Sequence, residues 1–149
     1  MRAVLQRVTS AQVTVGDRMT GQIGPGLLVL LGIEQGDGPA DIDYVAAKVR
    51  EVRVFPDEHG RMNRSLADAG GSVLVVSQFT LCGDVRKGRR PSFDAAAPPD
   101  RARALYEGVV RRLRDDGVTV ATGEFQAMMA VSLVNDGPVT LLLDSRRRF

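Results

Sequence analysis

The amino-acid sequence predicts a single α/β domain in which strands and two principal helices form layers around one core. Its 149 residues, 44% of them hydrophobic, suit one domain with a sizeable core. Residues 27–33 form a continuous apolar run of a length typical of a buried strand. Two stretches that begin near Pro39 and Pro98 instead repeat apolar residues at helical spacing. The order of strands, helix, strands, helix and strands therefore indicates a layered α/β or α+β domain.

The first half of the chain is predicted to begin with short strands at residues 3–8 and 11–15. Residues 21–26 are rich in turn formers, and residues 27–33 then form a central strand that is covered on both faces. The first helix follows Pro39, because apolar side chains recur at helical spacing at Ile42, Val45, Val49 and Val52. Alternation returns at residues 52–55, before a charged loop at residues 56–60.

The second half contains another strong strand signal at residues 72–81, whose apolar start gives way to Ser77, Gln78 and Thr80. A buried strand that turns polar at its carboxyl end is a common place for a functional site. Residues 82–98 lack periodicity, and a segment of this length is uncommon unless it is functional or disordered. The second helix follows Pro98, with an apolar stripe at Ala102, Leu105, Tyr106, Val109 and Leu113. Further strands are predicted at residues 118–121, 125–129, 131–134 and 139–143.

The segment Asn135-Asp136-Gly137-Pro138 lies between the last two predicted strands and is interpreted as a hairpin turn. Pro138 fits a hairpin poorly, because it removes a backbone donor where the strand ladder should resume. It also creates a Gly–Pro bond, and about 5–6% of X–Pro bonds are cis in folded proteins.

Several functional classes are disfavoured by the composition. The single cysteine, Cys82, excludes an internal disulfide, and with the single histidine, His59, it argues against a Cys/His metal site within one chain. No apolar run approaches a membrane span, and the start of the chain does not resemble a signal peptide. We therefore expect a cytoplasmic protein without metal or cofactor. No motif indicates a His-based triad or a phosphate loop.

Positive charge is clustered although the formal net charge is only +2. Four cations lie within residues 86–90, and further arginines follow at positions 111, 112 and 114 and at positions 146–148. Such a patch can contact a polyanion or be solvated surface, and the cluster at 111–114 is interpreted as a solvated helix face. The domain is predicted to span residues 1–145, followed by a basic tail at residues 146–149.

Two motifs resemble the signatures of the D-aminoacyl-tRNA deacylases: Ser77-Gln78-Phe79-Thr80-Leu81 and Asn135-Asp136-Gly137-Pro138-Val139-Thr140. The resemblance extends over nearly the whole chain, and further similar stretches lie at residues 1–8, 24–29, 61–63 and 89–93. Cys82-Gly83 is a mild departure from the family pattern that leaves both motifs intact. The resemblance implies a three-layer sheet/helix/sheet domain of mostly antiparallel strands with two main helices.

The resemblance also implies a function. Such proteins hydrolyse the ester between a D-amino acid and the 3′ end of tRNA, a proofreading step in translation, and glycine on tRNA is a further candidate substrate. They are homodimers in which a cis Gly–Pro bond reaches the partner's site. Gly137 and Pro138 would then exclude L-amino acids with backbone carbonyls, and Arg7 would brace their turn. Ser77, Gln78 and Phe79 would line the substrate pocket, with backbone N–H groups near Phe79 facing the developing oxyanion.

The sequence allows two roles for Thr80. Thr80 is either the nucleophile, or a structural residue in a reaction where the 2′-hydroxyl of the terminal adenosine assists attack by water. The second alternative is favoured because the sequence supplies no evident base for Thr80. The sequence is also compatible with two other functions. One is an RNA-binding module that uses residues 86–90 and the helix arginines, and the other is a small-substrate ester hydrolase that acts through Thr80.

Overall fold

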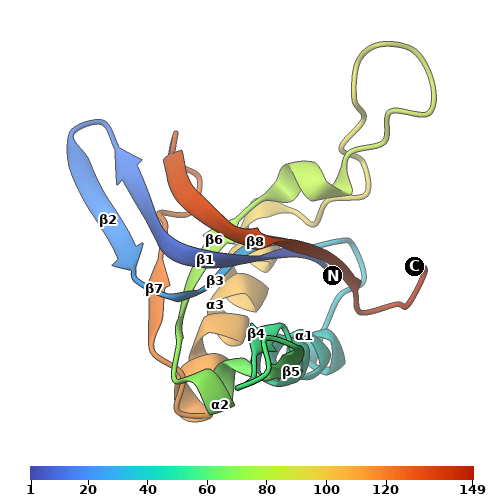
Figure 1. The fold of residues 1–149 in the computed structure, drawn as a ribbon. Coiled ribbons are helices and arrows are strands. Elements are labelled where there is room, and N and C mark those ends of the chain that lie inside the picture. The colour runs from blue at the N-terminus through green and yellow to red at the C-terminus, as the bar shows by residue number, and fades with distance from the viewer.

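The computed structural model describes residues 1–149 and contains a six-stranded mixed sheet with helices on one face (Figure 1). The large sheet consists of β1 (Arg2–Val15), β2 (Arg18–Ile23), β3 (Gly26–Gly32), β6 (Ser72–Ser77), β7 (Val120–Thr122) and β8 (Ala130–Asp144). The helices are α1 (Pro39–Glu51), α2 (Leu66–Ala69) and α3 (Pro99–Asp115), with a 3₁₀ turn, η1 (Phe79–Cys82). A small sheet of β4 (Phe55–Pro56) and β5 (Met62–Arg64) lies beside α2 on the helical side.

The long strand β1 is the centre of the antiparallel part of the sheet. One of its edges pairs with β8 along almost its whole length, and the other pairs first with β3 and then with β2. The strands β3, β6 and β7 are parallel, and the connections between them contain α1 and α3. The predicted single α/β domain, with mostly antiparallel pairing and two main helices, is thus confirmed.

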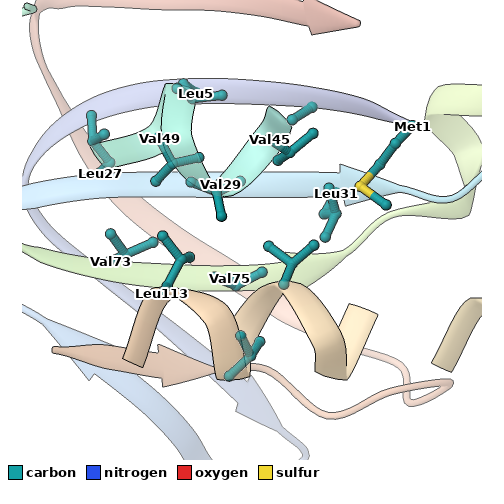
Figure 2. Close-up of a cluster of buried hydrophobic side chains, with 14 of the residues drawn as sticks. Met1, Leu5, Leu27, Val29, Leu31, Val45, Val49, Val73, Val75 and Leu113 are labelled. Atoms are coloured by element: carbon teal, nitrogen blue, oxygen red, sulfur yellow. The ribbon is translucent and has the colours of Figure 1, made fainter. Parts of the chain in front are cut away.

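The main hydrophobic core fills the space between the sheet and the two long helices (Figure 2). Val45 and Val49 of α1 and Leu113 of α3 are fully buried in it, together with side chains of β3 and β6. A second, smaller cluster covers the opposite face of the same two strands through Leu28, Leu74 and Val76. The prediction that residues 27–33 form a strand buried on both faces is therefore confirmed.

Four predicted strand boundaries were wrong. β1 runs without a break through Thr9 and Ser10, because β8 pairs with it on both sides of these residues. Part of the turn-rich stretch forms β2, which pairs with the end of β1. β6 ends at Ser77, where the backbone of Gln78 leaves the extended region and η1 begins. Residues 125–129 form turns, since Gln126 has a φ of 63° and Ala127 N–H bonds to Glu124.

A buried acidic cluster joins the two ends of the chain. The side chain of Asp37 is fully buried and accepts from the Met1 amino group at 2.7 Å and from Arg146 at 3.1 Å. Arg148 bonds to both Glu34 and Asp144. Burial raises the pKa of the Glu34 carboxyl, but the hydrogen bond from Arg148 and nearby positive charges bring that pKa below its ordinary value. Burial also raises the pKa of the Asp144 carboxyl, but the hydrogen bond from Arg148 brings that pKa below its ordinary value.

The cluster predicts acid-dependent stability. Since the pKa values of Glu34 and Asp144 are lowered on folding, their stabilising effect is present above the unfolded pKa of about 4 and is lost as pH falls through the folded values. Arg148→Ala is expected to lower the free energy of unfolding by about 1–3 kcal/mol at pH 7. The loss should shrink toward pH 2, as measured by urea denaturation at each pH. Arg147→Ala removes a charge that has no carboxylate partner, together with a guanidinium 5.5 Å from the centre of the Tyr44 ring, and should cost about 0.5–1 kcal/mol at every pH. An Arg148→Ala loss that does not change with pH would contradict this account.

Candidate functional site

A cavity of about 900 Å³ lies at the carboxyl end of β6. It is mainly apolar, and Ser77, Gln78 and Phe79 form one of its sides. Its other walls come from the segment that leads into α3, at positions 93–99, and from the turns that lead into β8, at positions 125–131. Three of the predicted site residues are therefore brought together at the strand end that the sequence singled out.

The change from strand to 3₁₀ turn leaves two backbone donors without a backbone acceptor at the edge of this cavity. Gln78 N–H still bonds to Leu31 of β3 at 2.8 Å, and Leu81 N–H then bonds to the Gln78 carbonyl at 3.2 Å. Between them, the N–H groups of Phe79 and Thr80 open η1 and have no acceptor within the turn. Such a pair of main-chain donors is suited to a carbonyl oxygen that gains negative charge.

The hydroxyl of Thr80 is engaged within the motif. Gln78 Nε2 donates to Thr80 Oγ1. No histidine, lysine or carboxylate side chain is hydrogen-bonded to Thr80, and the only histidine, His59, is exposed beside Glu58 in the distant β4–β5 loop. The arrangement gives Thr80 an amide donor and supplies no base for it.

Phe79 gives the cavity an accessible aromatic wall. Its side chain is 56% exposed although it is large and apolar. The ring of Phe93 meets it edge to face, with ring centroids 5.0 Å apart. Phe93 was not predicted as a site residue, because only the tertiary fold carries residues 91–93 back to η1. A flat apolar surface of this kind is suited to stacking with a nucleobase.

The second motif does not form the predicted hairpin. β8 continues through it without reversing direction, and the Gly137–Pro138 peptide bond is cis. The pairing passes from Gln6 with Thr140 to Val8 with Asn135, so that residues 136–139 bulge out opposite Arg7. Asn135 Nδ2 closes the bulge by donating to the carbonyls of Arg7 at 2.9 Å and Val139 at 3.0 Å. The hairpin prediction was wrong because β1 is long enough to pair with both flanks of the motif.

Arg7 packs directly against this bulge. Its side chain is only 12% exposed, and Nε lies 3.0 Å from Asp136 Oδ2. Nη1 donates to the Val54 carbonyl at 2.6 Å, which ties the bulge to the segment before β4. Nη2 would lie 2.9 Å from a Cβ atom at Gly137. Arg7 thus fills the space beside Gly137 and holds its neighbour Asp136.

One chain does not bring the two motifs together. In the sheet, Arg7 pairs with Leu27 and Leu27 with Val73, whereas Ser77 lies four residues further along β6. The bulge on β8 is separated from β6 by β1 and β3. With strands about 4.8 Å apart and a rise of about 3.3 Å per residue, the separation is about 14 Å across the sheet and about 13 Å along it.

The remaining titratable groups near the site are structural. Burial raises the pKa of the Cys82 thiol, which donates to the Ile33 carbonyl. Burial also raises the pKa of Tyr106 to about 12, and its hydroxyl donates to the Val75 carbonyl at 2.9 Å. Neither group is positioned for chemistry in the cavity. No group of three or more His, Cys, Asp or Glu side chains is arranged to hold a metal ion, and none of the helices is both long and apolar enough to cross a membrane.

Comparison with known proteins gives a consistent assignment. The family model for D-Tyr-tRNA(Tyr) deacylase matches residues 4–144. The D-aminoacyl-tRNA deacylase of Syntrophotalea carbinolica is 62% identical over 149 residues and is covered completely, as is this chain. That of Heliobacterium modesticaldum is also 62% identical, over 98% of this chain and 97% of its own.

Solved structures agree with the fold described above. The structure of a c-Myc DNA unwinding element binding protein is 40% identical, with a TM-score of 0.91 over 97% of this chain and 98% of its own. A probable eukaryotic D-amino acid tRNA deacylase has a TM-score of 0.79 over 95% of this chain and 97% of its own. At 20% identity, this second similarity concerns the fold alone.

Proposed function

Because the chain belongs to the D-Tyr-tRNA(Tyr) deacylase family and is a D-aminoacyl-tRNA deacylase, we propose that its active site is assembled from two subunits. The cavity at the end of β6 receives the terminal adenosine and the scissile ester. Gly137 and Pro138 of a second copy close it. The observation that carries this proposal is the separation of the two motifs in one chain, by about 14 Å across the sheet and about 13 Å along it.

The outer edge of β8 supports a homodimer. β8 is 15 residues long and pairs only with β1, so its other edge is free. Long open edges of this kind are usually covered in native proteins. Val134, Leu141 and Leu142 on the same strand are large apolar side chains with 56%, 37% and 66% of their surface exposed. Contact between two copies along β8 would cover these side chains and project the bulge toward a partner.

Backbone recognition accounts for selection by chirality rather than by side chain. Carbonyl groups of Gly137 and Pro138 that occupy the space of an L side chain would reject every L-amino acid in the same way. A D side chain points elsewhere, so its identity matters little, and glycine has no side chain to reject. Each factor of ten in discrimination requires about 1.4 kcal/mol, which a steric clash readily supplies.

The chemistry we propose uses position and main-chain donors. Ser77, Gln78 and Phe79 line the pocket, and the N–H groups of Phe79 and Thr80 stabilise the oxyanion, for which one donor contributes roughly 3–4 kcal/mol. The adenosine 2′-hydroxyl assists attack by water, and Thr80 keeps the motif in place through Gln78. The ester C–O bond breaks, and free D-amino acid and tRNA are released. The translational substrate agrees with a cytoplasmic location.

Stereospecific hydrolysis is the direct test. Purified protein is expected to release amino acid from D-tyrosyl-tRNA and to leave L-tyrosyl-tRNA nearly intact, with rates at least about a hundredfold apart, or about 2.7 kcal/mol. Glycyl-tRNA should be hydrolysed as well. Release of labelled amino acid is followed against a protein-free control for each substrate. Equal rates on the two enantiomers would overturn backbone-based rejection and favour a general esterase.

A further inference from the structure

The segment between η1 and α3 forms an arm that projects from the domain (the yellow-green loop in Figure 1). We call residues 84–92 the basic arm. Its base is closed by two hydrogen bonds, from Asp84 N–H to the Ser92 carbonyl at 2.7 Å and from Ser92 N–H to the Asp84 carbonyl at 2.9 Å. Every residue from Val85 to Ser92 is exposed. The arm therefore has a fixed base and an accessible tip.

The four cations of the arm are not equivalent. Arg86 is paired with Asp84 through Nε and Nη2, the closer of these contacts being 2.6 Å. That hydrogen bonding lowers the pKa of Asp84 to about 2, so the pair stays ionised at neutral pH and shapes the base. Lys87, Arg89 and Arg90 have no carboxylate partner and flank Gly88, which has a φ of 69° at the tip. Three positive charges thus lie together on an exposed turn.

Both ends of the arm connect to the wall of the cavity. η1, with Phe79, ends at Cys82 just before the arm, and Phe93 follows directly after it. The contact between the Phe79 and Phe93 rings joins the two ends. The next residue, Asp94, accepts from Gln35 Nε2 at 2.6 Å through its carbonyl. A chain of nucleotides that leaves the cavity past Phe93 would meet Arg90 and Arg89 within about 13 Å, the span of four extended residues, with Lys87 on the other side of the turn at Gly88.

From this arrangement, and resting on the proposed function, we propose that Lys87, Arg89 and Arg90 bind phosphates of the substrate RNA beyond its terminal adenosine. Arginine and lysine on an exposed loop are typical phosphate contacts. They position the RNA without reading its sequence. The arm therefore contributes to binding of the polynucleotide and has no part in cleavage of the ester.

The test compares two variants that lose the same charge. The arm variant carries Lys87→Ala, Arg89→Ala and Arg90→Ala. The control variant carries Arg61→Ala, Arg111→Ala and Arg147→Ala, three exposed arginines on other elements without a carboxylate partner. Binding of uncharged tRNA is measured by fluorescence anisotropy between 50 and 200 mM salt. Hydrolysis is measured on D-tyrosyl-tRNA and on D-tyrosyl-adenosine, which lacks the phosphates.

Three phosphate contacts to single-stranded RNA correspond to a slope of about −2 in log K against log salt. The arm variant is expected to lose about that much slope, so its loss of tRNA affinity relative to the wild type should be about 20-fold larger at 50 mM than at 200 mM salt. KM for D-tyrosyl-tRNA should rise with kcat unchanged, and kcat/KM for D-tyrosyl-adenosine should stay at the wild-type value. The control variant should keep most of the wild-type slope.

Three outcomes would overturn the proposal: an unchanged salt slope, equal losses in both variants, or an equal loss on D-tyrosyl-adenosine. Failure of the proposed function is recognised separately. Wild-type protein that binds tRNA through the arm but hydrolyses neither D-tyrosyl substrate would refute the deacylase site and leave the arm's phosphate contacts supported.

Discussion

If the site is shared between two subunits of a symmetric dimer, a one-to-one mixture of Gly137→Ala and Phe79→Ala subunits is expected to recover about a quarter of the wild-type deacylase activity. Each variant alone is expected to be strongly impaired. Random pairing makes half of the dimers mixed. In each mixed dimer, one site combines the intact cavity of one subunit with the intact Gly137 of the other, while the second site carries both defects. Activity is measured on D-tyrosyl-tRNA after co-refolding.

The defect expected for Gly137→Ala follows from its surroundings. A Cβ atom there would lie 2.9 Å from Arg7 Nη2, closer than real Cβ atoms approach their neighbours, and a tight 3.0 Å from Val139 Cγ2. The backbone φ of 116° is also unfavourable for alanine. Either the bulge or the Arg7 side chain that packs against it must shift, and a displacement of about 1 Å in the bulge is enough to reduce a positioned reaction by about a hundredfold. For Phe79→Ala, loss of the accessible ring removes a stacking surface worth about 1–3 kcal/mol.

Gly16→Ala is the matched control. Gly16 also has a positive φ, of 58°, but it lies in the turn between β1 and β2 and has no atom within 4 Å of an added Cβ. This variant should lose stability by about 1 kcal/mol and retain activity. A mixture without recovered activity, in which native mass spectrometry nevertheless detects mixed dimers, would contradict a shared site.

Replacement of the 2′-hydroxyl of the terminal adenosine by hydrogen is expected to slow hydrolysis by about 10²–10⁴-fold, the usual contribution of a positioned proton-transfer group. Thr80→Ala should stay within about tenfold of the wild-type rate, since its hydroxyl is hydrogen-bonded to Gln78 and no base contacts it. Single-turnover rates on 2′-deoxy and ordinary D-tyrosyl-tRNA separate the two effects from substrate binding.

Thr80→Ser is the companion variant, because it keeps the hydroxyl and removes only a methyl group. If Thr80 is the nucleophile, Thr80→Ser remains active, Thr80→Ala loses all activity while it still folds and binds tRNA, and the 2′-deoxy substrate is cleaved normally. That combination would refute assistance by the 2′-hydroxyl and assign the chemistry to Thr80.

Local sequence patterns were sufficient to predict the helices and strands whose apolar side chains recur at a regular spacing. The apolar spacing predicted α1 and α3, and the continuous apolar run predicted β3, because burial against a core imposes a period that the sequence displays. The polar end of β6 likewise indicated the place of the cavity. The prediction of two strands for β1 failed because Thr9 and Ser10 are polar, whereas strand continuity there depends on pairing with β8.

For Asn135 to Thr140, local sequence was enough to predict that the chain departs from a regular strand, since Pro138 lacks the N–H that a ladder requires. It did not determine the direction in which the chain continues. Turn chemistry is local, but the choice between a hairpin and a bulge depends on a partner strand more than a hundred residues away. Long-range contacts select the bulge: β1 pairs with both flanks, Arg7 packs beside Gly137, and Asn135 closes the bulge.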